Sequence, residues 1–256
     1  MTTPRSHLAG SEGRTAVVTG ATHGVGLAVA RRLCASGIDV RLTYAHDDAR
    51  AEQALRSLEG LPGRATAHPS DAADPEALEA LLAEVAHGVG HLDFFVHNTA
   101  HFRPAPTLQT PKESVDRALA TALTPLLAGA SRLAALMAGR QGRIIAVSSL
   151  GARRVVPHYL SAGIAKAALE SQVRYLAAEL AGQGITVNAV STAKIDKDDA
   201  TASPEMLKAL ARRTPAGRLT TPEDIADVVA LLCAEEARWI QGQVITADGG
   251  LSLIAG

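Results

Sequence analysis

Short apolar runs alternate along the chain with longer segments in which apolar residues recur every three or four positions. The short runs are rich in Val, Ile, Phe and Thr, as buried strands are, whereas the longer periodic segments are typical of amphipathic helices. Strands are expected at 15–19, 39–44, 63–68, 92–97, 143–148, 185–190 and 243–247. Helices are expected at 27–33, 49–58, 75–87, 161–182, 204–213 and 222–234, with one or two more between 111 and 140.

This order of elements indicates an α/β fold. Strands that alternate with helices of ten or more residues are typical of βαβ units, in which the strands are parallel and the crossovers right-handed. We therefore expect a single doubly wound Rossmann-type domain with a central seven-stranded parallel sheet over residues 13–256, with its ligand at the carboxyl ends of the strands. Residues 1–12 are polar and aperiodic and are expected to form a flexible tail.

The first expected strand is followed at once by three glycines and then by a helix. Gly20 permits a tight turn, Gly24 lets the backbone approach phosphates, and Gly26 lets the helix pack closely on the strand. A helix N-terminus carries unpaired N–H groups and partial positive charge, so a pyrophosphate can bind there. A glycine triplet also occurs in α/β loops without this role, so its weight comes from its place between strand and helix. The candidate contacts of this turn are Gly20, Thr22, His23, Gly24, Val25 and Gly26.

Composition narrows the classes of protein that fit. The chain has 256 residues, of which 47% are hydrophobic and only 3% aromatic, so the core is expected to consist mainly of Ala, Val, Leu and Ile. A formal net charge of −1 gives no electrostatic case for nucleic acid or an anionic membrane. The sequence shows no basic-then-apolar leader and no apolar run of membrane-spanning length, so a cytoplasmic location is expected.

The residue types that often bind metals are not arranged for that purpose. Cys34 and Cys233 each lie in an apolar helical run and are interpreted as buried thiols rather than as a disulfide or metal pair. The histidines fit no zinc-binding spacing and are expected to lie scattered in loops; they include His23, His46, His97, His101 and His158. No metal is therefore expected.

Polar residues follow successive strands further along the chain: Asp71 after the third, Asn98 after the fourth and Ser149 after the fifth. Tyr159 and Lys166 lie at the next helix. Together with the glycine turn, these motifs resemble the short-chain dehydrogenases/reductases over nearly the whole chain. The resemblance implies catalytic roles for Ser149, Tyr159 and Lys166, and cofactor contacts at Asp71, Asn98, Lys166 and Ile195. Without it, Tyr159 could be a surface tyrosine and Ser149 a strand-end cap.

The spacing of Tyr159 and Lys166 narrows the resemblance. Most of the superfamily has three residues between these two, which would put the tyrosine at Ala162, whereas here there are six. Seven residues correspond to about 700° of helical rotation and about 10 Å of rise, so both side chains can share a face. This spacing is similar to that of enoyl-acyl-carrier-protein reductases, most of all the type III (FabL-like) group. That resemblance implies hydride transfer from NADPH to the β-carbon of an enoyl thioester, with the tyrosine stabilising the enolate oxygen and the lysine holding the nicotinamide ribose.

The choice of cofactor is made at the end of the second strand, where an acidic residue would bind the ribose 2′-hydroxyl and select NAD. Tyr44 occupies that position, and His46 follows where the type III reductases place an arginine for the 2′-phosphate. Protonated His46 could supply that charge near neutral pH, while Asp47 and Asp48 would oppose it. NADPH is therefore favoured and NADH is left open.

Three functions are compatible with these motifs. An NAD(P)H-dependent reductase of a small-molecule or carrier-protein-bound enoyl thioester is favoured. A ketoreductase of a polyketide or other secondary-metabolite carbonyl would share the fold and cofactor. A redox-inactive nucleotide-binding partner protein is the third, because several family positions differ, namely Ala120, Thr192, Ala193 and Lys197. By resemblance, residues 192–215 form a substrate lid, and the chain assembles as a homo-oligomer, either tetramer or dimer.

Overall fold

The strands form one parallel sheet. A computed structural model describes residues 8, 13–196 and 203–254. Its seven strands lie in the order β3-β2-β1-β4-β5-β6-β7, and every neighbouring pair is parallel. Their bounds are β1 Thr15–Val18, β2 Asp39–Tyr44, β3 Ala65–Pro69, β4 Phe94–His97, β5 Arg143–Val147, β6 Thr186–Ser191 and β7 Val244–Thr246. The predicted seven-stranded, doubly wound sheet is confirmed.

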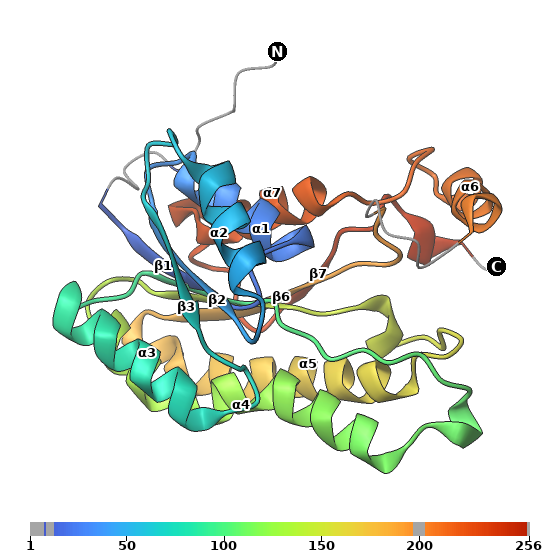
Figure 1. Ribbon diagram of the computed structural model, residues 1–256, viewed down its shortest axis with the longest axis horizontal. Coiled ribbons are helices and arrows are strands. Elements are labelled where there is room, and N and C mark those ends of the chain that lie inside the picture. The colour runs from blue at the N-terminus through green and yellow to red at the C-terminus, as the bar shows by residue number, and fades with distance from the viewer. Residues whose placement is uncertain (1–7, 9–12, 197–202, 255–256) are drawn as a thin grey trace.

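Helices cover both faces of this sheet (Figure 1). The bounds are α1 Gly24–Cys34, α2 Asp48–Leu58, α3 Pro75–Gly88, α4 Lys112–Met137, α5 Leu160–Leu180, α6 Pro204–Arg213 and α7 Pro222–Cys233. In Figure 1, α1, α2 and α7 lie above the sheet, α3, α4 and α5 lie below it, and α6 stands apart near the last strands. Local sequence sets several helix starts: α7 begins with a capping box between Thr221 and Asp224, and Pro222 takes the first helical position.

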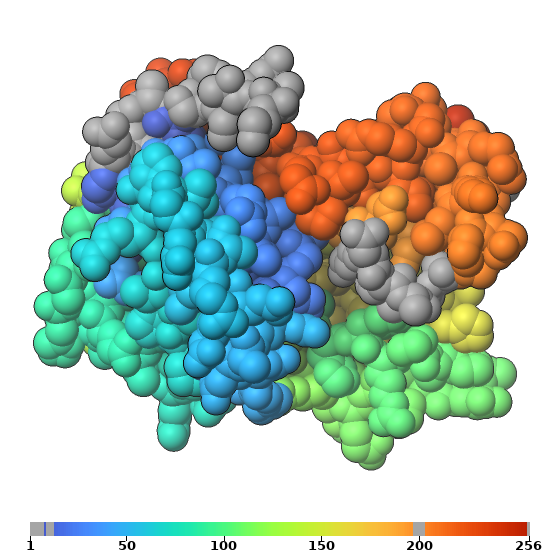
Figure 2. Space-filling model, turned by 45° about the horizontal axis from the view of Figure 1, so that its top comes forward, coloured from blue at the N-terminus to red at the C-terminus, as the bar shows by residue number. Residues whose placement is uncertain are grey.

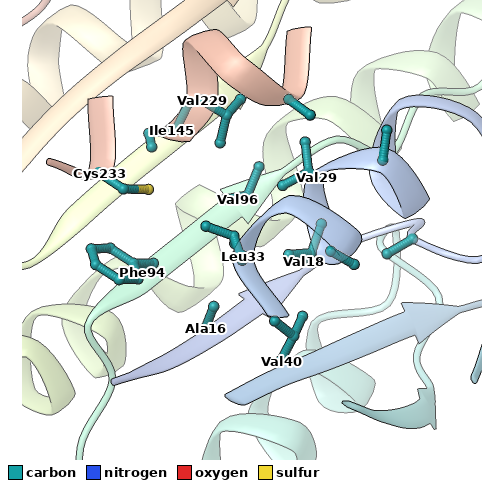
Figure 3. Packing of buried hydrophobic residues seen from close by; sticks show 14 of the residues in the cluster. Ala16, Val18, Val29, Leu33, Val40, Phe94, Val96, Ile145, Val229 and Cys233 are labelled. Atoms are coloured by element: carbon teal, nitrogen blue, oxygen red, sulfur yellow. The ribbon is translucent and has the colours of Figure 1, made fainter. Parts of the chain in front are cut away.

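Two apolar layers explain why the strands are hydrophobic on both sides. On one face, Val29 and Leu33 of α1 and Val229 of α7 pack over Val18 and Val96 (Figure 3). On the other face, α3, α4 and α5 bury a second cluster against β1, β4, β5 and β6. Parallel strands covered on both faces are expected to be continuously apolar, as these are. Leu8, the one described residue of the expected tail, is buried in the first cluster.

The segment between residues 111 and 140, where one or two helices were expected, forms the single helix α4. It continues through Pro125, which is buried within it. Among the helices of the described residues, α4 alone is long and apolar enough to be considered as a membrane span, and it packs against α3 and α5 as a core helix.

The direction in which strands are added to the sheet reverses between β1 and β4. The chain builds β1, β2 and β3 toward one edge, then crosses to β4 and continues toward the other. In sheets of this type the ligand crevice lies outside the carboxyl ends of the strands at that reversal. The ends of β1 and β4 are followed by Gly20 and Asn98, two of the predicted cofactor contacts.

Candidate functional site

The glycine turn after β1 has the geometry that a pyrophosphate requires. Gly20 and Gly24 adopt positive φ angles of 62° and 54°, which side chains disfavour. No atom lies within 4 Å of where a Cβ on Gly24 would stand, so the backbone at the start of α1 is open. A Cβ on Gly26 would lie 2.4 Å from the carbonyl oxygen of Gly20. The turn thus has the backbone conformation and the close packing expected of it, while its contact with a pyrophosphate stays a prediction.

The turn is braced from β4. The backbone N–H groups of Asn98 and Thr99 donate to Thr19 Oγ1 at 3.0 and 3.2 Å. The Asn98 side chain donates to the carbonyl oxygen of Gly20 at 2.9 Å and that of Thr19 at 3.2 Å. Asn98 thus holds the turn in shape from across the sheet reversal.

His97 extends this brace toward α4. Its Nδ1 accepts from Thr19 Oγ1 at 3.0 Å, and its Nε2 donates to the carbonyl oxygen of Ala122 at 2.9 Å. Burial, together with the nearby charge of Lys166, lowers the pKa of His97 to about 3, so the ring is neutral. The expectation of a loop histidine is wrong here, because residue 97 ends β4 and its ring is fully enclosed.

Two buried hydroxyls at the carboxyl ends of the strands find no hydrogen-bond partner within the described parts of the chain. They are Thr99 Oγ1, which lies 3.0 Å from the place of a Cβ on Gly20, and Thr192 Oγ1, which follows β6. A buried polar group left unpaired costs roughly 1–3 kcal/mol. The open glycine turn and the unpaired hydroxyl beside it fit a dinucleotide laid across the ends of β1 and β4.

Asp71, one of the predicted cofactor contacts, lies after β3 and is already engaged in bonds within the chain. Its carboxylate accepts from the N–H of Ala73 at 3.0 Å and forms an ion pair with Arg117 of α4. Partial burial alone would raise the pKa of Asp71, but the bonds from Arg117 and Ala73 outweigh it and lower the pKa. At the end of β2, the Tyr44 hydroxyl donates to Asp48 at 2.7 Å, and His46 is exposed.

A groove of 430 Å³ runs between α1 and α2 from the glycine turn. Three basic side chains line it: His23 of the turn, Arg31 of α1 and Arg50 of α2. Arg31 donates to the carbonyl oxygen of Ser57, and Arg50 lies 3.6 Å from Asp47. Sequence reasoning missed Arg50, although it follows His46 by only four residues.

Tyr159 caps the start of α5 and faces the loop after β5. The Ser149 side chain acts on its hydroxyl, and its ring centroid lies 4.9 Å from that of Phe102. Burial raises the pKa of Tyr159, against a smaller lowering from the interaction with Ser149. The ring lies so close over Gly151 that a Cβ there would stand 2.5 Å from Tyr159 Cδ1. Two of the three predicted catalytic residues are thus in contact.

Lys166, the third, lies inside the fold on α5. Its ammonium donates to the carbonyl oxygen of Val147 at 2.6 Å, two residues before Ser149. Burial lowers the pKa of Lys166 to about 8. Ala162, which stands where most of the superfamily has its tyrosine, is buried and offers no hydroxyl. A phenol, a serine hydroxyl and an ammonium therefore converge on the loop at the end of β5.

The last predicted contact, Ile195, follows β6 and forms an isolated parallel bridge with Thr220. Of the expected lid, residues 192–196 and 203–215 are described, and α6 makes up most of the second part. Lys197 lies outside the described residues. Figure 2 shows the surface indented where α6, the blue N-terminal half and the green segment before α4 meet. Within the described ranges, no group of three or more metal-ligating side chains occurs.

Comparison with known proteins identifies the family of this chain. The sequence model described as enoyl-(acyl carrier protein) reductase matches residues 20–252. The chain belongs to the short-chain dehydrogenase/reductase family. It is 35% identical to 1-cyclohexenylcarbonyl-CoA reductase of Streptomyces collinus, over all of this chain and 92% of that protein. It is 30% identical to the 3-oxoacyl-[acyl-carrier-protein] reductase FabG of Escherichia coli, over 95% of this chain and 99% of that one.

A solved structure agrees with the family membership. The short-chain dehydrogenase of Burkholderia cenocepacia, in complex with NADP, superimposes with a TM-score of 0.86 at 33% identity, over 94% of this chain and 99% of that one. The chain is thus an oxidoreductase of a family that binds NAD(P), with relatives named as both enoyl and 3-oxoacyl reductases.

Proposed function

We propose that this short-chain dehydrogenase/reductase uses NADPH to reduce the carbon–carbon double bond of an enoyl thioester. The supporting observation is the position of Tyr159, seven residues before Lys166, with its hydroxyl at Ser149 and its ring against Phe102. The usual tyrosine position is taken by buried Ala162, so the phenol of Tyr159 is the acid group available at the start of α5. The relative that acts on a cyclohexenylcarbonyl-CoA is consistent with this chemistry.

Bound NADPH supplies the hydride, and the residues of the chain supply charge and orientation. The Tyr159 hydroxyl would donate a hydrogen bond to the thioester carbonyl oxygen, where the negative charge of the enolate would develop, and the α-carbon would then take a proton from water. The Lys166 ammonium donates to the carbonyl oxygen of Val147 and so provides a positive charge at the end of β5. This charge stabilises negative charge on the groups that bind there. Burial keeps this region at low dielectric, so both interactions are stronger than in water.

The direct test is NADPH oxidation with crotonyl-CoA and with crotonyl carried on an acyl carrier protein. We expect consumption of NADPH at 340 nm and formation of the saturated thioester by mass spectrometry. Tight binding of NADPH with no turnover of any enoyl thioester would reject the assignment and leave a ketoreductase or a nucleotide-binding partner protein. Comparing the two carriers identifies the form of substrate.

A ketoreductase is the second candidate, because the paired hydroxyls of Ser149 and Tyr159 could both bind one ketone oxygen. The substitution Ser149→Ala separates the two functions when crotonyl and acetoacetyl thioesters are assayed side by side. If the enzyme reduces enoyl groups, the variant keeps much of its crotonyl activity. If it reduces ketones, loss of one oxygen contact lowers turnover of the acetoacetyl thioester by about 10²-fold or more.

Lys166 is expected to set the upper limit of the pH range. Because burial lowers the pKa of Lys166 to about 8, the ammonium loses its proton as pH rises through that value, and its positive charge is lost. The ratio kcat/KM should therefore fall above pH 8. In Lys166→Arg the guanidinium stays charged, so this fall should move to higher pH even if the rate is lower. A fall at the same pH in both proteins would assign it to another group.

The groove between α1 and α2 supports the choice of NADPH. We expect Arg50→Gln to weaken NADPH binding about tenfold, because one charge-assisted contact to the 2′-phosphate is lost, while NADH binding stays unchanged. Arg56→Gln is the matched control, since Arg56 lies on the same helix but pairs with Glu52 outside the groove. Calorimetric titration of both nucleotides measures the effect. If the affinities for NADPH and NADH fall equally, Arg50 does not bind the 2′-phosphate.

Homo-oligomer formation is also proposed. Large apolar side chains are exposed on α4, α5 and near the C-terminus, among them Leu127, Tyr175 and Leu253, which are 69%, 78% and 84% exposed. Single apolar side chains are often exposed on the surface of a monomer. Here several lie on adjacent helices, which suits an interface with a second copy of the chain. Light scattering after size exclusion should give a dimer or tetramer, and a monomer at micromolar concentration would reject it. A cytoplasmic location stays a prediction.

A further inference from the structure

We infer that Glu170 is a positioning residue that fixes the loop on which the Tyr159 phenol rests. Glu170 lies on α5, four residues after Lys166, and its side chain is only 5% exposed. The inference rests on the proposed role of Tyr159 in enoyl reduction. Nothing in the motifs of the sequence singles out this carboxylate.

Both oxygens of the Glu170 carboxylate are used. Ser148 Oγ donates to Oε1 at 2.8 Å, and Arg153 Nε donates to Oε2 at 2.9 Å. A buried carboxylate is costly unless it is paired and hydrogen-bonded, so these two contacts are what allow it to lie there. Arg153 itself is 55% exposed, so the ion pair joins the buried face of α5 to the surface of the loop.

The two partners of Glu170 lie on either side of the residues that contact the phenol. Between Ser148 and Arg153, Ser149 acts on the Tyr159 hydroxyl and Gly151 lies directly under the ring. The same stretch is held on its other side by the N–H of Leu150, which donates to the carbonyl oxygen of Thr192 at 2.8 Å. Glu170 therefore acts on Tyr159 through the loop without touching the ring.

The close contact between Tyr159 and Gly151 means that any movement of the loop 148–153 would also move the Tyr159 ring. A Cβ on Gly151 would stand 2.5 Å from Tyr159 Cδ1, so ring and backbone are already close. If the loop relaxes by about 1 Å, the hydroxyl leaves the position needed for the thioester oxygen, and errors of that size cost about 10²-fold in rate. A loss of fit of this kind should affect kcat rather than the affinity for NADPH, because the glycine turn expected to hold the pyrophosphate makes none of these loop contacts.

The experiment is Glu170→Gln, which keeps the shape of the side chain but removes its charge. We expect kcat with crotonyl-CoA to fall about tenfold or more, with the Kd of NADPH unchanged, because the loop but not the glycine turn is loosened. Glu179→Gln is the matched control, since Glu179 is an exposed carboxylate on the same helix, and it should behave as the wild type. Ser148→Ala, which removes one contact only, should show a smaller effect of the same kind and serves if Glu170→Gln folds poorly.

A second readout follows the phenol itself and does not depend on turnover. The chain has three tyrosines, so replacing Tyr44 and Tyr175 by phenylalanine leaves Tyr159 as the only phenol that titrates by ultraviolet absorbance. In that background, Glu170→Gln should move the titration of Tyr159 toward that of a solvent-exposed tyrosine, because the enclosure that raises its pKa is loosened.

The outcomes separate this inference from the proposed function. An unchanged kcat together with an unchanged titration of Tyr159 in Glu170→Gln would overturn the inference. Equal losses in NADPH binding and kcat would also overturn it, since they would indicate a general loss of structure. If the wild type turns over no enoyl thioester, the proposed function fails, yet the titration still reports whether Glu170 holds the phenol.

Discussion

Replacing Tyr159 by phenylalanine is expected to lower kcat for enoyl-thioester reduction by about 10²- to 10³-fold, the cost of removing one donor from an oxyanion site. Phenylalanine keeps the ring that packs against Phe102 and over Gly151, so the loop should keep its shape. Only the hydroxyl is lost, and with it the interaction with the Ser149 side chain. The binding of NADPH should be unchanged, because the Tyr159 hydroxyl contributes nothing to the shape of the glycine turn.

Tyr175→Phe is the matched control for this prediction. Tyr175 lies on the same helix, but it is 78% exposed and contributes nothing to the loop after β5. Single-turnover measurements at saturating NADPH separate chemistry from release of product. If Tyr159→Phe reduces crotonyl-CoA as fast as the wild type, the phenol is not the donor to the carbonyl oxygen, and the proposed mechanism is wrong.

Most of the fold was predictable, because each element is defined by its own stretch of sequence. Apolar runs buried on both faces and helices with local caps leave a clear periodic signal, as at α3, where Asp74 caps and Pro75 opens the helix. Some strands were expected one or two residues too long, since hydrophobic runs such as 92–97 extend beyond the hydrogen-bonded part of β4, whereas β2 has the bounds expected for it. The sequence left open whether residues 111–140 form one helix or two. They form the single helix α4, because tertiary packing around Pro125 overrides the tendency of proline to end a helix.

The glycine turn was predictable in detail for the same reason. Its conformation depends on residues that are adjacent in sequence, and the backbone angles of Gly20 and Gly24 follow from the absence of a side chain. The brace by Asn98 could be expected from its place at the end of the neighbouring strand. Local geometry of this kind needs no knowledge of distant contacts.

Contacts between distant segments were not predictable. Arg117 pairs with Asp71 across 46 residues, and nothing in either segment marks the other. Likewise His97 looks like any loop histidine until β4 is placed beside β1 and α4, where Thr19 and Ala122 bind its two nitrogens. Glu170 lies four residues after Lys166 and shares its helical face, but this spacing alone indicates neither a role nor a partner for the carboxylate.

The contact of Tyr159 with Ser149 lies between these two cases. Helical geometry predicted that Tyr159 and Lys166 could share a face of α5, yet their relation to the β5 loop depends on the irregular path of residues 150–158. Short loops of this kind follow from packing rather than from periodicity. The chemistry of the site thus rests on a loop conformation that only the folded chain defines.

The second large effect is expected from Gly26→Ala, which should weaken NADPH binding by about 10²-fold or abolish it. A Cβ at this position would lie 2.4 Å from the carbonyl oxygen of Gly20, 2.7 Å from Asn98 Nδ2 and 2.8 Å from Ala21 Cα. Two of these neighbours are backbone, so the turn itself must move. Overpacking of this kind costs about 1–3 kcal/mol, and each 1.4 kcal/mol that falls on the bound state is a tenfold loss of affinity.

Gly182→Ala is the control, because Gly182 has no atom within 4 Å of its would-be Cβ and no positive φ angle. Calorimetry with NADPH and with ADP-ribose then locates the effect. Since Gly26 shapes the part of the site that would hold the pyrophosphate, the variant should bind both ligands worse by the same factor. If only NADPH binds more weakly, the substitution disturbs the nicotinamide end of the site. If both ligands bind as in the wild type, the dinucleotide does not lie on this turn.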